Sequence, residues 1–267
     1  MLIGAHVSVK GGLLTAFDRA RELGAEAVQV NPTPPQTWRH LHLEPELVIQ
    51  FRERMSATGL HAFFFHAVYL INLGTPRPEL LANSEGSLRH YLELANQLGV
   101  RGVVFHPGSH LGQGFDAVLG QIGQALRRAL EGAPGESLLL IENSAGAGAN
   151  IGSSLAQIRR MMEAVDSPRV GLCLDTAHAF TSGWQLTTEE GLSAALAELE
   201  SEIGWDRLWA VHANDSKAAF GSNRDRHENI GEGEIGSEAF RRMLAHPQLR
   251  RAPWILEVPG EARQGPD

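Results

Sequence analysis

The sequence has a single cysteine and no long apolar run. Cys173 has no second cysteine with which to form an internal disulfide, so the chain fits a reducing compartment. It lies in an apolar run, which predicts a small core residue and not a nucleophile. No apolar stretch approaches the ~18 residues needed to span a bilayer, and the start, MLIGAHVSVKGG, lacks the basic and apolar regions of a signal peptide. We therefore expect a cytoplasmic protein with no membrane partner.

An excess of basic residues is also missing. The chain has 23 Lys and Arg against 31 Asp and Glu, a formal net charge of −8. This balance argues against a non-specific binder of polyanions, because such proteins usually carry a basic surface. Bound divalent cations would add positive charge that the formal count omits, so nucleic acid stays open as a partner.

Short apolar runs alternate with longer amphipathic stretches along the whole chain. Several of these stretches end in glycine, as helices often do, and strand–helix alternation indicates a parallel sheet. Eight strands in a chain of this length predict a single TIM-barrel domain over residues 1–267. A doubly wound open sheet is the competing fold, but no convincing GxGxxG follows the first strand. The strands are expected at 2–7, 27–30, 61–67, 102–106, 137–143, 170–175, 208–214 and 254–258.

The end of the chain departs from a complete barrel. Only PGEARQGPD follows Val258, whereas a full eight-fold barrel carries another helix after its last strand. We therefore expect the eighth helix to be absent.

Histidine and carboxylate side chains stand at the ends of six successive predicted strands. In a TIM barrel these positions meet at the C-terminal mouth, where active sites of this fold lie. A single histidine here is usually structural, and a lone Asp can cap a helix, but six in register favour divalent metal ions. Three more candidates lie in nearby loops. The nine exceed the needs of one zinc and predict a multi-metal site, a recurrent device for phosphodiester hydrolysis. They are His66, His106, Glu142, Asp175, His178, His212, Asp225, His227 and Glu257.

Motifs from the first strand to the last resemble the endonuclease IV family, the zinc-dependent apurinic/apyrimidinic endonucleases of DNA repair. IGAHVS alone would be weak, but the HxND-SK pattern together with DRHxxIGxGxIG is specific. The matching stretches are IGAHVS, YLINLG, FHPGSH at 105–110, IENSAGAGANIG at 141–152, LDTAHAF at 174–180, VHANDSK at 211–217, DRHENIGEGEIG at 225–236 and ILEVP at 255–259.

This resemblance implies a TIM barrel that holds three zinc ions per chain. It implies that the enzyme cuts double-stranded DNA on the 5′ side of abasic sites, with Glu142 as the catalytic carboxylate that anchors two metals. We expect a monomer with no protein partner. By position, His66, His106 and Glu142 would hold the first zinc, Glu142, Asp175, His212 and Glu257 the second, and His178, Asp225 and His227 the third.

The resemblance also implies three DNA-contacting residues. Tyr69 and Leu70 match residues that push into DNA at the lesion, although both fit a core role equally well, and Trp38 matches a residue of the loop after the second strand. That loop, NPTPPQTWRH, departs from the basic and amide-rich segment usual in the family, and FFF precedes His66 where a proline is usual.

Two other functions fit parts of the pattern. Sugar isomerases and epimerases of the xylose-isomerase-like barrels also place metal ligands at strand ends, but they do not need Asp225 or His227. A non-catalytic module that binds damaged DNA would fit the altered second loop, but it has no use for nine intact ligands.

Overall fold

The computed structural model describes residues 1–260 and Gly265. Eight parallel strands close into a barrel in the order β1-β10-β7-β6-β5-β4-β3-β2, which confirms the predicted TIM barrel and excludes the open sheet. The strands lie within two residues of the expected positions. They are β1 Ile3–His6, β2 Ala27–Val30, β3 Ala62–His66, β4 Gly102–Phe105, β5 Leu138–Glu142, β6 Val170–Asp175, β7 Leu208–Ala213 and β10 Trp254–Leu256.

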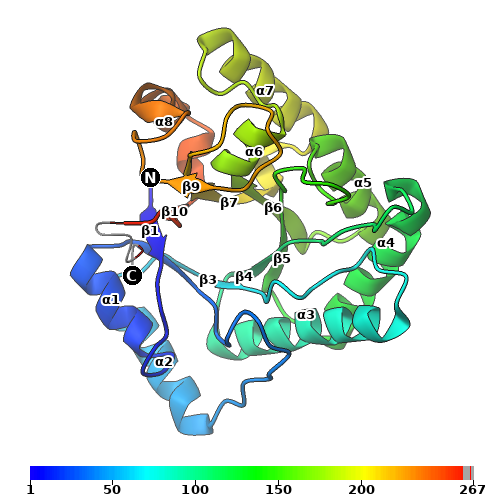
Figure 1. Cartoon of the computed structure of the whole chain (residues 1–267). Helices are drawn as coiled ribbons and strands as arrows, with labels where there is room; N and C mark the ends of the chain where they lie inside the picture. The colour runs from blue at the N-terminus through cyan, green and yellow to red at the C-terminus, as the bar shows by residue number, and fades with distance from the viewer. Residues whose placement is uncertain (261–264, 266–267) are drawn as a thin grey trace.

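Helices surround the ring of strands (Figure 1). Local sequence sets many of their ends: Pro45 and Pro78 stand in first turns, Gly24 ends a helix with a φ of 68°, and the Ser154 hydroxyl accepts the amide proton of Gln157. The helices are α1 Thr15–Leu23, α2 Pro45–Ala57, α3 Pro78–Leu98, α4 Phe115–Gly132, α5 Leu155–Val165, α6 Thr176–Ser182, α7 Glu189–Glu202 and α8 Gly236–Ala245, with short 3₁₀ turns at Trp205–Arg207 and Leu249–Arg251.

The strands are buried on both faces, as expected for a parallel sheet covered by helices. One apolar cluster lies between strands and helices, and a smaller one, including Phe64, Leu140 and Ile255, fills the barrel interior. Cys173 belongs to the interior cluster, as predicted for a core residue. Burial raises the pKa of its thiol to about 12, so the thiol is not poised to act as a nucleophile. The predicted metal ligands therefore lie beyond this apolar interior, at the C-terminal ends of the strands.

The segment between β7 and α8 forms a small second sheet that the sequence analysis did not predict. Here β8, Asp215–Ser216, pairs antiparallel with β9, His227–Glu228. In Figure 1 this segment crosses beside the ends of β6 and β7. It therefore brings Asp225 and His227 to the barrel mouth.

The expectation of a missing eighth helix falls mainly on residues 261–264 and 266–267, outside the described part of the chain. Residues 257–260, which follow β10 directly, contain no helix. Among the described residues, the helices are too short or too polar to cross a membrane.

Candidate metal centre

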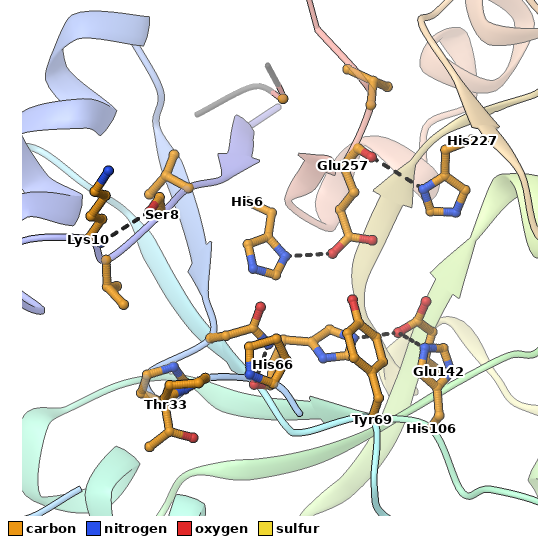
Figure 2. A pocket seen from close by; sticks show the side chains of 18 of the residues that line it. His6, Ser8, Lys10, Thr33, His66, Tyr69, His106, Glu142, His227 and Glu257 are labelled. Carbon is orange, nitrogen blue, oxygen red and sulfur yellow. Dashed lines mark hydrogen bonds and ion pairs between the residues drawn. The ribbon is translucent and has the colours of Figure 1, made fainter. Parts of the chain in front are cut away.

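The nine predicted ligands converge at the C-terminal mouth of the barrel. Four of them end or nearly end their strands, and His106 and Glu257 follow β4 and β10 by one residue. Most are buried, and Figure 2 shows His66, His106 and Glu142 turned towards one another below Glu257 and His227. The described residues form three groups whose ligand atoms lie within 4.8 Å of one another: His66, His106 and Glu142; Glu142, Asp175, His212 and Glu257; and Asp175, His178 and His227.

The first group joins β3, β4 and β5 through one carboxylate. Nε2 of His66 lies 3.0 Å from Oε2 of Glu142, and Nε2 of His106 lies 3.4 Å from the same oxygen. Two imidazoles and a carboxylate are the ligand types that zinc takes in catalytic sites. The group thus offers three protein ligands and can leave a fourth position open.

The second group surrounds a ring nitrogen that lacks a hydrogen bond. Nδ1 of His212 lies 3.1 Å from Oε1 of Glu142, 3.1 Å from Oε2 of Glu257 and 4.0 Å from Oδ2 of Asp175. The nitrogen is buried, yet it makes no hydrogen bond with any described residue. An unsatisfied buried polar atom among converging carboxylates is costly, and a cation between them would satisfy all four groups. These residues therefore fit a metal ion.

The third group, Asp175, His178 and His227, lies at the rim. Asp225, which the resemblance makes a ligand of the third zinc, stands beside this group on the loop before β9 and is not part of it. The two carboxylate oxygens of Asp225 lie 3.2 Å from Nε2 of His178 and 3.2 Å from Nε2 of His227. The His227 nitrogen is also 3.7 Å from Oδ2 of Asp175 and makes no hydrogen bond within the described chain. Asp175, which the resemblance assigns to the second zinc alone, is thus within reach of both groups.

Main-chain carbonyls orient three of the ligand histidines. A carbonyl can only accept a hydrogen bond, so the ring nitrogen beside it must carry the proton and the other nitrogen can bind a metal. Each Nδ1 donates: His66 to Ala67 at 2.9 Å, His178 to Asn143 at 3.0 Å, and His227 to Glu257 at 3.3 Å.

Buried amides hold Asp175 in place. Asn214 donates from Nδ2 to Oδ2 of Asp175 at 2.6 Å, and the amide of Asp175 donates to Oδ1 of Asn143 at 2.6 Å. The other oxygen, Oδ1, accepts the amide proton of His178 at 2.7 Å and so caps α6. Asp175 therefore performs the capping role and still presents Oδ2 to the metal groups. Sequence reasoning missed both asparagines, although each follows a ligand by one or two residues in IEN and HAN.

A second buried carboxylate, Asp215, fixes the glycine-rich segment at residues 231–236, which follows His227 of the third group. It accepts hydrogen bonds from the amide of its neighbour Ser216 and from four amides of that segment. Gly233 must lack a side chain, because a Cβ there would meet Oδ1 of Asp215 at 2.5 Å. The donors are the amides of Ser216 at 2.8 Å, Gly231 at 2.9 Å, Gly233 at 3.2 Å, Ile235 at 2.9 Å and Gly236 at 3.1 Å.

Charges in the centre compensate one another without metal. Burial would lower the pKa of His178 and His212, but their neighbours outweigh it and raise both well above 6.5: chiefly the Asp175 and Asp225 carboxylates at His178, and Cys173 followed by Glu257 at His212. Burial would likewise raise the pKa of Glu142, but the surrounding histidines hold it well below its usual range. Protonated imidazoles thus supply the positive charge that metal ions would otherwise supply. Metal ions must displace these protons to bind.

Comparisons with known proteins agree with this geometry. A family model described as a xylose isomerase-like TIM barrel matches residues 17–267. The "Probable endonuclease 4" of Methanoculleus marisnigri is 39% identical over 267 residues, covering 99% of this chain and 94% of that protein. Its counterpart in Halothermothrix orenii is 37% identical over 260 residues, covering 97% and 94%. The crystal structure of endonuclease IV from Thermus thermophilus matches with a TM-score of 0.87 and 34% identity, over 98% of this chain and 94% of that one. The chain belongs to the endonuclease IV family.

Other barrels share only the fold. A D-tagatose 3-epimerase-like protein matches with a TM-score of 0.69 at 19% identity, over 96% of this chain and 90% of that one. The endonuclease IV motifs quoted above, in contrast, carry eight of the nine ligands, all but His66, together with the glycine-rich segment that Asp215 fixes.

The metal groups open into a cavity of about 730 Å³. Its wall includes Lys10 from the loop after β1, Pro35 from the proline-rich loop, and Tyr69, whose ring centroid lies 6.0 Å from that of His66. Tyr69 is 62% exposed and so is not a core residue. Leu70 and Trp38 are half-buried and pack against the core outside the cavity. Of the three residues that the endonuclease IV resemblance links to DNA, only Tyr69 lines this opening.

Proposed function

We propose that this member of the endonuclease IV family is a zinc-dependent AP endonuclease of base excision repair. It hydrolyses the phosphodiester bond on the 5′ side of an abasic site in double-stranded DNA. One water adds across the bond between phosphorus and the 3′ oxygen. The phosphate keeps the oxygen of the water, and the released strand end becomes a 3′-hydroxyl.

The observation that carries this proposal is the convergence of nine ligands, of which seven line one open cavity and the fully buried Asp175 and His212 contact them. Nδ1 of His212 and Nε2 of His227 both face carboxylates without making a hydrogen bond, as expected of atoms that bind metals. Imidazole and carboxylate donors suit zinc, and three adjoining groups support three ions per chain. Zinc bound there would supply a nucleophilic water at neutral pH and offset the negative charge that builds on the phosphate.

The residues of the chain determine how these groups act together. Glu142 presents Oε2 to the first group and Oε1 to the second, so it keeps the two at a fixed separation. Asp175 links the second group to the third through a single oxygen, Oδ2, which lies 4.0 Å from Nδ1 of His212 and 3.7 Å from Nε2 of His227. The third group lies at the rim beside the exposed Asp225, which leaves it accessible to a phosphate that enters the cavity. We assign Glu142 as the central catalytic carboxylate for this reason.

A nicking assay with metal analysis tests the proposal. The purified protein should contain three zinc ions and should cut a duplex with one tetrahydrofuran abasic analogue on its 5′ side, leaving the undamaged duplex intact. Chelation should abolish cutting, and added zinc should restore it. A fully zinc-loaded protein that leaves the abasic duplex uncut would overturn the proposal.

The epimerase alternative has support from the fold alone. Asp225 and His227 lie between β7 and the glycine-rich segment 231–236 that Asp215 binds through four amides, an arrangement that sugar isomerisation would not require. Assays with ketose sugars under the same metal conditions should therefore show no turnover. The complete ligand set likewise argues against a module that only binds damaged DNA.

A further inference from the structure

We propose that Gln29 is a positioning residue that sets which ring nitrogen of His212 faces the metal groups and holds Glu257 in its binding orientation. The inference rests on the metal-binding part of the proposed function. Gln29 lies on β2, its side chain is fully buried, and it reaches across the mouth of the barrel to ligands from β7 and the end of β10. In the sequence it is an isolated polar residue in AVQV, and no motif marks it.

Its amide contacts two ligands of the same metal group. Oε1 of Gln29 lies 2.9 Å from Nε2 of His212, and Nε2 of Gln29 lies 2.6 Å from Oε1 of Glu257. His6 adds to the contact, since its Nδ1 lies 2.8 Å from Oε1 of Glu257 and 3.0 Å from the amide nitrogen. Figure 2 shows the His6 ring facing the Glu257 carboxylate.

The direction of these hydrogen bonds follows from the chemistry of the groups. The Glu257 carboxylate only accepts, so the NH₂ end of the amide must face it; two oxygens 2.6 Å apart would repel. The amide oxygen then faces His212, so Nε2 of His212 must carry a proton and donate it. Nδ1 is thereby the nitrogen left for a metal, and it is the one enclosed by Glu142 and Glu257 without a hydrogen bond.

His212 differs in this respect from the histidines that use main-chain carbonyls. His66, His178 and His227 each donate from Nδ1 to a carbonyl, an interaction that no side-chain substitution removes. His212 offers the opposite nitrogen to the metal group, and its Nε2 donates to the Gln29 side chain. The orientation of this one ligand is therefore encoded by a residue on a distant strand.

Gln29→Met tests the inference, because methionine fills similar space without either hydrogen bond. The second zinc should bind roughly 10–100-fold more weakly, the usual effect of removing a group that orients a metal ligand, while the other two zincs stay bound. The measurement is competition with a chromogenic chelator. Gln121→Met is the matched control: it removes amide bonds to the carbonyls of Leu73 and Thr75, away from the metal groups, and should retain the parent affinities.

Nitrogen NMR of the zinc-loaded parent provides a test that needs no variant. The His212 ring should show a protonated Nε2 that exchanges slowly with solvent and a zinc-shifted Nδ1. The inference is overturned if the proton is on Nδ1, or if Gln29→Met keeps all three zincs at parent affinity. A parent that binds zinc but does not cut abasic DNA would overturn the proposed function alone, and the affinity ratio of the variant would still decide the role of Gln29.

Discussion

The two inner metal groups and the third group at the rim are held in different ways. The inner ligands extend from barrel strands. The buried side-chain amides of Gln29, on β2, and of Asn214, directly after β7, hold these ligands in place. The third group draws His227, with Asp225 beside it, from the segment that precedes the glycine-rich residues 231–236 bound by the buried Asp215, and Asp225 is 58% exposed. The inner groups should therefore persist whenever the barrel folds, whereas the third can be removed while the barrel remains.

The largest effect is expected at Glu142, which both inner groups share. Glu142→Ala leaves the first group with two protein ligands and removes one from the second, so bound zinc should fall below three. Cutting of abasic DNA should slow by roughly ten-thousandfold or more, since two metals lose a common ligand. Zinc analysis and single-turnover nicking measure both effects.

Glu163→Ala is the matched control for that change. Glu163 is an exposed carboxylate on α5 that pairs with Arg159 and lies outside the metal groups, so its removal should leave zinc content and rate unchanged. Full metal content and near-parent turnover in Glu142→Ala would refute the assignment of Glu142.

The rim group should be removable on its own. His227→Ala leaves that zinc with His178, the exposed Asp225 and an oxygen of Asp175 that the second group also uses, so bound zinc should drop from three to two while the thermal unfolding midpoint stays close to the parent value. Cutting should slow by roughly a thousandfold through lost charge stabilisation. Affinity for abasic DNA should change far less. Exposed His61 provides the control substitution, and a His227→Ala protein that still holds three zincs would contradict the separation of the groups.

The stability of the metal-free protein should vary with pH in a way that reveals this charge compensation. The raised pKa values of His178 and His212 contribute stability that is fully present below pH 6.5 and is lost as the pH rises through the folded values. The lowered pKa of Glu142 contributes stability present above pH 4.5 and lost as the pH falls through its folded value. Thermal unfolding in chelator should thus give a maximum between pH 4.5 and 6.5. The zinc-loaded protein should lack the alkaline decline, and a metal-free protein that gains stability above pH 6.5 would disprove the account.

Asp215 should affect the rim group selectively. Asp215→Asn keeps the size of the side chain but removes the charge that five amides stabilise, so the glycine-rich segment next to His227 should loosen. We expect affinity for the third zinc to fall roughly tenfold while the inner zincs bind as in the parent. Asp206→Asn, at an exposed site, is the control. Equal weakening of all three zincs would show that Asp215 supports the whole barrel instead.

How far the sequence could predict this site depends on how each residue reaches it. His66, Glu142 and Asp175 end apolar runs, so chain position alone places them at the mouth of a barrel. Gln29 acts on His212 from 183 residues away, and that contact exists only once the barrel has closed. The β8–β9 pairing likewise exists only once the polar loop between these two-residue strands has turned back on itself. Ligands could be predicted from local pattern, whereas the groups that orient them could not.

The smallest effect is expected at Tyr69, which belongs to neither set of ligands. Its ring lines the cavity beside His66, its amide donates to the carbonyl of Pro35 at 3.1 Å, and its side chain is largely exposed. Tyr69→Ala should weaken binding to an uncleavable, phosphorothioate-linked abasic duplex by ~1–3 kcal/mol, about the value of one lost stacking contact. Three zincs should remain bound. Leu70→Ala would be less informative, because Leu70 packs against the core and its loss would also create a cavity. Tyr69→Phe keeps the ring and should bind like the parent, which separates stacking from hydroxyl bonding. If Tyr69→Ala weakens intact and abasic duplexes equally, the residue contacts the DNA backbone, and recognition of the missing base must come from elsewhere in the cavity.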